Sequence, residues 1–384
     1  MRILLVSSSS GSRGGGELYL NYLGRALAER GHSPILWTST HSRMDELVHA
    51  FEDFGSVERC DYLNTYDRRL RSLSAVIDTK TVGSVLRSWE HISPEVIHLN
   101  KQNLEDGLDL LGALTQISIP SLCTIHLTQS ARYLKAVMAP VRDFVSRRAL
   151  LKYNGPLVTV LENRRADLNA FIGESNQIRT IPNGVPIFDL SNRESVRAAA
   201  RRKLEVDQGQ LLVLAVGRLV PQKRPMKFLE HAAVILASHP NTKFLWVGDG
   251  DVAEEWDRYV SRNNLSHAVS RIGWQSDVTP FLFAADLFMH VAEFEGLPLA
   301  ILEAMSAGLP CAISANLLSE MPFFDHESVI PIADNGSWTR ALDDGRRLEA
   351  IGRTARAIAE EQFSYSAMAA QYEALYREAI AAKS

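Results

Sequence analysis

The stretch EFEGLPLAILEAMSAG, residues 293–308, places two glutamates, Glu295 and Glu303, with seven residues between them. Proline suits the first position of a helix and glycine suits the position after its end, so this stretch predicts a helix over 297–306 with Pro298 at its first position. Glu303 then lies among apolar side chains, where a carboxylate is unfavourable unless something hydrogen-bonds to it. The fold and the role of Glu303 therefore have to be worked out together.

Outward from this stretch, short apolar runs alternate with longer helical patterns in both halves of the chain. Such alternation is typical of βαβ units, parallel sheets and the α/β fold class. The run 16–32 shows the helical spacing, and Gly31 is expected to end that helix. The expected strands are 2–7, 34–39, 96–99, 121–126, 157–160, 211–217, 243–248, 269–274, 287–291 and 310–314.

The segment 179–195 interrupts this alternation with two prolines, an Asn-Gly pair and polar residues. It is interpreted as a linker between two domains. Each half then forms its own doubly wound sheet, and we expect a cleft between the carboxyl ends of the two sets of strands.

Composition excludes several classes of protein. The chain has 384 residues, three cysteines and a formal net charge of −4, which argues against a nucleic-acid partner and against a disulfide framework. Its first residues indicate a strand instead of a signal peptide, and no apolar run approaches the ~18 residues of a membrane span. We expect a cytoplasmic protein, either soluble or peripheral at the inner face of the plasma membrane.

Two cations follow the strand expected at 211–217. Arg218 and Lys223 lie in a loop with glycine and proline, at the strand end where α/β folds bind ligands. Such a pair can bind a diphosphate, with the guanidinium contacting two oxygens at once. The alternative is a solvated basic loop.

Glycines follow two other strands. Gly14, Gly15 and Gly16 precede a helix, whose first N–H groups attract phosphate, although a plain tight turn is as good an interpretation. The dinucleotide fingerprint is not formed there, and no acidic residue ends the second strand, so a dehydrogenase is disfavoured. Gly248 lies in a second glycine turn, which is either structural or adjacent to a nucleotide.

Glu303 is the candidate for a ribose contact, because one carboxylate can accept hydrogen bonds from both ribose hydroxyls. The alternative is an ion pair with an arginine that serves packing alone. The first turn of the same helix presents N–H groups, which favour a phosphate.

With these features in hand, the chain resembles the retaining glycosyltransferases of the GT-B fold, specifically glycosyltransferase family 4. The resemblance covers nearly the whole chain. The motifs that carry it are IPNGV (181–185), VGRLVPQKRP (216–225), WVGDG (246–250) and EGLPLAILEAMSAGLP (295–310).

The resemblance implies a domain layout. Residues 1–182 would form an N-terminal Rossmann-like domain that binds the acceptor, and 183–363 a C-terminal Rossmann-like domain that binds the donor. The closing helix, 364–384, would cross back onto the first domain.

The resemblance also implies roles for single residues. Arg218 and Lys223 would neutralise the leaving diphosphate, Glu303 would bind the ribose, and Glu295 and His126 would lie beside the transferred sugar. By itself, a histidine at a strand end is more often structural. The remaining donor-binding candidates are Gly14, Gly15, Gly16, Gly217, Gly248, Gly296, Leu297 and Leu299.

The activity implied is transfer of a sugar, with retention of anomeric configuration, from a nucleoside diphosphate sugar, with UDP as the expected nucleotide. No metal and no further cofactor are expected. The acceptor is a glycan, a lipid-linked glycan or a small molecule. Two other hypotheses are a nucleotide-sugar 2-epimerase and an inactive sugar-nucleotide-binding subunit.

Three parts of the sequence depart from the resemblance. Glu162 stands where the family often has serine, and 55–110 and 128–152 match no acceptor pattern. The segment 138–153 carries Arg142, Arg147, Arg148 and Lys152 among apolar residues. It predicts either contact with an anionic membrane surface or a solvated helix face.

Overall fold

The computed structural model describes residues 1–11, 14–69, 71–77, 79–173, 178–333 and 337–383. The chain divides into two compact units, Met1–Gly184 with Tyr365–Ser384 and Val185–Ser364. The boundaries expected from the sequence were 182 and 363. No helix among the described residues is both long and apolar enough to cross a bilayer.

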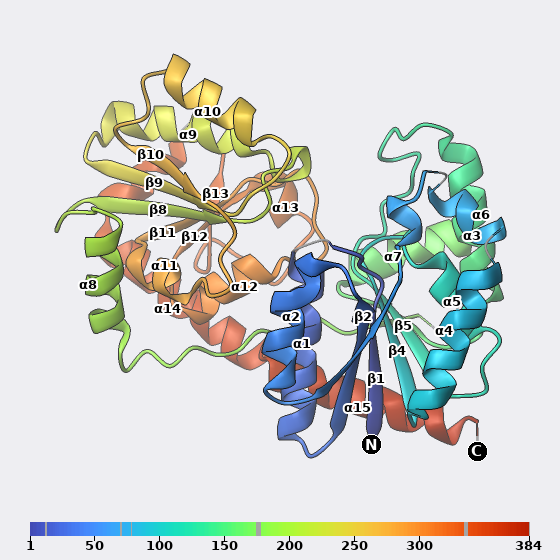
Figure 1. Ribbon diagram of the computed structural model, residues 1–384. Helices are drawn as coiled ribbons and strands as arrows, with labels where there is room; N and C mark the ends of the chain where they lie inside the picture. The colour runs from blue at the N-terminus through green and yellow to red at the C-terminus, as the bar shows by residue number, and fades with distance from the viewer. Residues whose placement is uncertain (12–13, 70, 78, 174–177, 334–336, 384) are drawn as a thin grey trace. The chain divides into compact units, whose positions relative to one another are not determined.

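The first unit has a seven-stranded parallel sheet in the order β3-β2-β1-β4-β5-β6-β7. Helices α1, α2 and α15 cover one face, and α4 and α5 cover the other (Figure 1). The strands are β1 (Arg2–Ser7), β2 (Ser33–Ser39), β3 (Ser56–Cys60), β4 (Val96–Lys101), β5 (Ser121–Ile125), β6 (Leu157–Thr159) and β7 (Ile178–Thr180). The helices are α1 (Gly15–Glu29), α2 (Asp45–Glu52), α3 (Ser74–Ile77), α4 (Thr79–Ile92), α5 (Leu108–Leu114), α6 (Ala139–Lys152), α7 (Glu162–Ile172) and α15 (Tyr365–Ala381).

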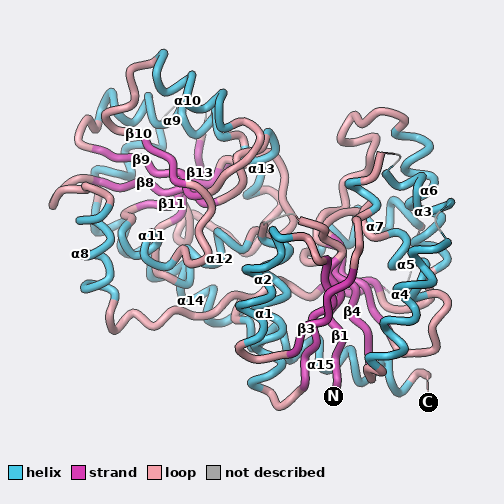
Figure 2. Tube along the Cα trace, viewed as in Figure 1, coloured by secondary structure: helices cyan, strands magenta, loops and turns pink. Residues whose placement is uncertain are grey.

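The second unit has a six-stranded parallel sheet in the order β10-β9-β8-β11-β12-β13. Helices lie on both faces of this sheet as well (Figure 2). The strands are β8 (Leu211–Val216), β9 (Thr242–Val247), β10 (Val269–Ile272), β11 (Leu287–His290), β12 (Cys311–Ser314) and β13 (Ile330–Ile332). The helices are α8 (Arg193–Lys203), α9 (Pro225–Ser238), α10 (Ala253–Arg262), α11 (Thr279–Ala284), α12 (Leu299–Ser306), α13 (Ala315–Leu318) and α14 (Gly345–Gln362).

The α/β fold class with two parallel sheets is confirmed. Every expected strand is present, with ends that differ by at most two residues. The sequence did not indicate β3, β7 or β13, and all three are edge strands. An edge strand is short and partly solvated, so it lacks the continuous apolar run that marks a buried parallel strand.

Two expected boundaries are wrong. The linker predicted at 179–195 includes the end of β7 and the start of α8. The helix predicted at 297–306 begins at Leu299, because Pro298 has an extended backbone (ψ 119°) and caps the helix instead of entering it. The expected glycine after this helix is confirmed, since Gly308 has a φ of +67° directly after the C-cap.

The C-terminal helix α15 packs on the first unit. Tyr365 Oη donates to Glu29 Oε1 (2.8 Å), and Glu373 pairs with Arg30 (2.7 Å), so both bonds join α15 to α1. Tyr372 and Tyr376 of the same helix are buried. The last helix of the chain is therefore part of the first unit's core.

A close backbone approach shapes the loop that follows β8. A Cβ added to Gly248 would lie 2.1 Å from the carbonyl oxygen of Gly217, and the φ of Gly248 is +136°. That carbonyl also accepts a hydrogen bond from Trp246 Nε1 (2.8 Å). The backbone thus requires glycine at position 248. This agrees with the structural interpretation of the turn and leaves the nucleotide contact as a prediction.

Gly248→Ala should destabilise the protein by about 1–3 kcal/mol, because the added methyl group overlaps backbone that cannot move away cheaply. Gly273→Ala is the matched control, since a Cβ there meets nothing within 4 Å. Its effect should stay below about 1 kcal/mol. Urea unfolding of both variants measures the difference, and equal midpoints would contradict this account of the loop.

Candidate functional site

The order in which the strands of the second sheet are added reverses between β8 and β11. Strands β9 and β10 continue from β8 on one side, and β12 and β13 continue from β11 on the other. Ligands in open α/β sheets bind outside the carboxyl ends of the strands at such a reversal. The two loops that start there are 217–224 after β8 and 291–298 after β11.

These two loops are bonded to each other. Glu293 N donates to the carbonyl oxygen of Gln222 (2.8 Å), and Gln222 Nε2 donates to the carbonyl oxygen of Phe294 (3.0 Å). Arg224 adds an ion pair with Glu293 (3.2 Å). The loop that carries the predicted cations therefore has a fixed position relative to the loop that carries Glu295.

Lys223 Nζ donates a short hydrogen bond to Glu295 Oε1. His290 Nε2 lies 3.1 Å from the same oxygen. Glu295 is 6% exposed and His290 is 4% exposed, so one carboxylate oxygen holds two donors away from bulk water. The structure thus brings together two of the predicted residues and adds a third, at the last position of β11.

Burial and charge act in opposite directions on Glu295. Burial alone would raise the pKa of this carboxyl, but the Lys223 charge and the His290 hydrogen bond outweigh it and lower the pKa to about 2. Burial also lowers the pKa of His290, against the effect of Glu295. The cluster is therefore an ionised carboxylate with an ammonium on one side and a neutral imidazole on the other at neutral pH.

The remaining predicted residues of the second unit differ in exposure. Arg218 is exposed on the same loop as Lys223, whereas Glu303 is 3% exposed within α12. Leu297 and Leu299 are buried, so their side chains belong to the core and only their backbone could meet a ligand. Gly296 is buried with them.

Helix α12 begins directly after the loop 291–298 that carries Glu295. Pro298 is its N-cap and offers no side-chain hydrogen bond to the first turn. A helix start without a side-chain cap attracts an anion, because its N–H groups and the helix dipole both favour negative charge. This adds a second positive feature beside Lys223.

In the first unit, Asn100 joins two predicted residues. Asn100 Nδ2 donates to the carbonyl oxygen of Gly16 (2.9 Å), and His126 Nε2 lies 2.7 Å from Asn100 Oδ1. Gly16 itself allows a close approach, since a Cβ there would lie 1.7 Å from Gln102 Oε1. Gly14 is the N-cap of α1, which starts at Gly15.

The Asn100 amide fixes the state of His126. Its Nδ2 donates to a carbonyl, so its Oδ1 must accept the proton of His126 Nε2, which leaves Nδ1 as the acceptor. Burial lowers the pKa of His126 to about 4. His126 is consequently a neutral imidazole whose Nδ1 lone pair can accept a hydrogen bond from a hydroxyl.

A second buried histidine continues this network to α15. His98 Nδ1 lies 2.7 Å from Tyr376 Oη, and its Nε2 lies 2.8 Å from Thr124 Oγ1. Burial lowers the pKa of His98 to about 3, and nearby His126 adds to the effect. Tyr372 Oη lies 2.9 Å from the same threonine oxygen. Two tyrosines of α15 therefore bond to β4, which contains Asn100, and to β5, which His126 directly follows.

Two residues of these networks escaped the sequence interpretation. His290 lay within the expected strand LFMHV (287–291) without a role of its own, and Asn100 came directly after the expected strand VIHL (96–99). The signal that could have found them is their position, since each is a polar residue at the carboxyl end of a strand beside a sheet reversal. Glu162 is exposed and pairs with Arg165 (3.4 Å), so its departure from the family pattern has no visible consequence.

Two family models match the chain. The model described as Glycosyltransferase Family 4 matches residues 13–187, and the model described as Glycosyl transferases group 1 matches 196–357. Together they span well over half of the sequence. The chain belongs to glycosyltransferase family 4.

Curated relatives of this family 4 chain include two with named activities. The UDP-Gal:alpha-D-GlcNAc-diphosphoundecaprenol alpha-1,3-galactosyltransferase of Escherichia coli is 26% identical over 257 residues, 64% of each chain. The alpha-monoglucosyldiacylglycerol synthase of Acholeplasma laidlawii is 20% identical over 59% of this chain and 60% of its own. The match spans less than two thirds of the length of either relative.

Solved structures share the GT-B fold of this family 4 chain. The Anabaena protein Alr3699/HepE, in complex with UDP-glucose, superposes with a TM-score of 0.77 over 100% of both chains at 18% identity. The sucrose-phosphate synthase of Thermosynechococcus elongatus gives 0.76 over 99% of both chains at 21% identity. The expected GT-B fold, with its two Rossmann-like sheets, is confirmed.

Acidification below pH 6.5 should destabilise the first unit, because His98 and His126 are neutral when folded. Their folded pKa values, about 3 and about 4, lie below the ordinary 6.5, so the unfolded chain binds more protons between pH 6.5 and 4. The free energy of unfolding therefore decreases as the pH is lowered through that window, by up to about 1.4 kcal/mol per pH unit for each histidine.

Urea unfolding at pH 7, 6 and 5 measures this slope. His126→Gln is the informative variant, because an amide N–H can still donate to Asn100 but does not titrate. For this variant, the change in unfolding free energy per pH unit should be smaller than in the wild type by the contribution of one histidine. Identical slopes would show that His126 is not a buried neutral group.

Proposed function

We propose that this chain is a retaining glycosyltransferase that moves a sugar from a nucleoside diphosphate sugar, with UDP as the nucleotide, and needs no metal ion. The observation that carries the proposal is the Lys223–Glu295–His290 cluster at the reversal of the second sheet, with Arg218 on the same loop. The complexes that the related Anabaena structure forms with UDP-glucose support the choice of nucleotide.

Lys223 is held in position before any substrate binds. An ammonium has three N–H donors, so Lys223 can keep its bond to Glu295 and still donate to a phosphate oxygen. Because Glu295 is bonded on one oxygen by both Lys223 and His290, its other oxygen is available for a sugar hydroxyl. The ammonium thus needs little rearrangement to meet a diphosphate.

Arg218 supplies the second charge. Its exposed guanidinium can contact two oxygens of the diphosphate at once, while the uncapped start of α12 adds N–H donors. These fixed donors stabilise the negative charge that develops on the departing diphosphate, which is the largest contribution to rate in reactions of this kind. Glu303 is assigned to the ribose, because one carboxylate can accept hydrogen bonds from both ribose hydroxyls.

Retention is assigned to a front-face reaction, as the family implies. The bond between the anomeric carbon and the diphosphate oxygen breaks, and the acceptor oxygen bonds to that carbon on the same face. The acceptor proton passes to an oxygen of the leaving phosphate. His126 is assigned to a hydroxyl of the transferred sugar through its Nδ1 acceptor.

The acceptor remains a glycan, a lipid-linked glycan or a small molecule. The Escherichia coli relative is named for transfer onto a GlcNAc-diphosphoundecaprenol, and the Acholeplasma relative for synthesis of a glucosyldiacylglycerol. Both names describe lipid-linked products, which favours that class of acceptor here.

Nucleotide binding should be visible before any acceptor is known. UDP should raise the melting temperature more than GDP, ADP or NAD, and Arg218→Ala should reduce that increase because one partner of the diphosphate is gone. Differential scanning fluorimetry without divalent metal measures both effects. Stabilisation by NAD alone would contradict the proposal.

Lys223→Ala should lower the turnover of a UDP-sugar roughly 10²–10³-fold, the loss expected when one transition-state donor is removed. Lys227→Ala is the matched control, because it removes a lysine that pairs with Glu230 in α9 instead (3.1 Å). Release of UDP from a panel of UDP-sugars measures both. Near-normal turnover by Lys223→Ala would remove this lysine from the mechanism.

A further inference from the structure

One surface of the first unit exposes many apolar side chains. Ten large apolar side chains are exposed among the described residues, and seven of them lie between 133 and 151. Val137 is 82% exposed and Phe144 is 63% exposed. The seven, which we call the α6 surface, are Tyr133, Leu134, Val137, Met138, Val141, Phe144 and Leu151.

Helix α6 buries polar as well as apolar side chains, and it exposes several large apolar ones. Its buried side includes Arg142 and Ser146, whereas Phe144 and Leu151 point outward. Arg142 was expected among the basic residues of the surface, and that expectation is wrong. It donates from Nε and Nη2 to the two carboxylate oxygens of Glu105 (2.7 and 2.5 Å), and this buried pair fixes which face of α6 turns inward.

Cations surround the exposed apolar side chains. The exposed basic residues of the segment are Arg132, Lys135, Arg147, Arg148 and Lys152. The acidic residue within it, Asp143, accepts hydrogen bonds from the backbone N–H groups of Ala131 and Arg132 (2.7 and 3.1 Å). The segment is strongly positive although the whole chain has a net charge of −4.

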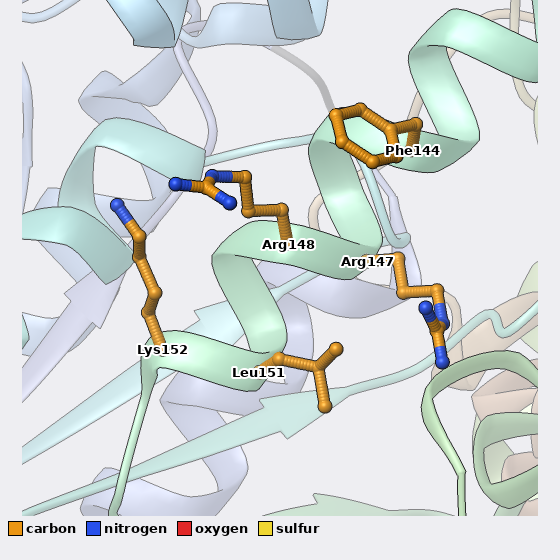
Figure 3. A pocket seen from close by; sticks show the side chains of 5 residues that line it. All are labelled: Phe144, Arg147, Arg148, Leu151 and Lys152. Carbon is orange, nitrogen blue, oxygen red and sulfur yellow. The ribbon is translucent and has the colours of Figure 1, made fainter.

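The two kinds of side chain are interleaved on α6. Phe144, Arg147, Arg148 and Leu151 follow one another at spacings of three, one and three, so they share one helix face and line a surface hollow with Lys152. Figure 3 shows Arg148 and Lys152 extending to one side of the helix, with Arg147 and Leu151 on the other. Aromatic and aliphatic side chains therefore lie next to positively charged ones on this part of α6.

We propose that the α6 surface docks on a bilayer that contains anionic lipid. Lysine and other charged residues are depleted at the centre of protein interfaces, whereas helices that lie in a membrane surface combine Phe and Leu with Lys and Arg. The long basic side chains can reach the phosphate groups while Phe144 and Leu151 enter the acyl boundary. This docking depends only on the first unit's surface and stands apart from the proposed transfer reaction.

Co-sedimentation of the full chain with vesicles of phosphatidylcholine and phosphatidylglycerol tests the proposal. The wild type should bind these vesicles at low salt and bind pure phosphatidylcholine far less. Lys135→Gln/Arg148→Gln/Lys152→Gln should weaken binding to the anionic vesicles on the order of a hundredfold, since each cation near the surface contributes roughly fivefold. Arg147 is left in place because its Nε donates to the carbonyl oxygen of Phe171 (2.9 Å).

Phe144→Gln/Leu151→Gln should weaken binding at least roughly tenfold without changing the charge. The matched control is Arg202→Gln/Lys203→Gln/Arg258→Gln, which removes three exposed cations of the second unit and should leave binding unchanged. Circular dichroism melting checks that each variant is folded.

Three results would overturn the proposal. One is wild-type protein that stays in the supernatant with anionic vesicles at low salt. Another is a control variant that loses as much binding as the α6 charge variant. The third is concentration-dependent self-association that Phe144→Gln/Leu151→Gln abolishes while vesicle binding is unaffected, because a second copy of the chain would then cover the surface.

Discussion

The ion pair between Lys223 and the buried carboxylate of Glu295 is the interaction on which the candidate site depends. Removing one partner of such a pair costs about 3–5 kcal/mol, because the other charge is left in a poorly solvated place. His290 reduces that free-energy cost, because it also hydrogen-bonds to this carboxylate oxygen. The cluster is possible only because β8 and β11 are neighbouring parallel strands, so that their carboxyl ends lie at the same edge of the sheet. The parallel sheet thus creates the position, and the ion pair determines which way the ammonium points.

The first unit positions its candidate residues with hydrogen bonds between neutral groups instead of an ion pair. Asn100 bonds to Gly16 on one side and His126 on the other, so a single amide holds the first turn of α1 and sets the tautomer of the histidine. Beneath them, the tyrosines of α15 complete the hydrogen bonds of His98 and Thr124. The end of the chain therefore supports residues at the carboxyl ends of β4 and β5.

Much of this arrangement follows from the sequence, because buried parallel strands are continuous apolar runs and the residues after them gather at one edge. That reasoning gave the interior strands, the helix containing Glu303 and the loop with Arg218 and Lys223. It could not give β3, β7 and β13, three of the four edge strands, which are short; β3, with the sequence SVERC, is also half polar. It also missed His290 and Asn100, since a polar residue at the end of a run has no meaning until the order of the strands is known. Arg142 was misplaced for the same reason, because its partner Glu105 is 37 residues away in sequence.

The central claim is that Arg218 and Lys223 bind the diphosphate of the donor. A crystal structure of the protein soaked with UDP tests it most directly. The account predicts phosphate oxygens within hydrogen-bond distance of both side chains, with Lys223 still bonded to Glu295. Density for UDP at any other place, or a diphosphate that contacts neither cation, would contradict it.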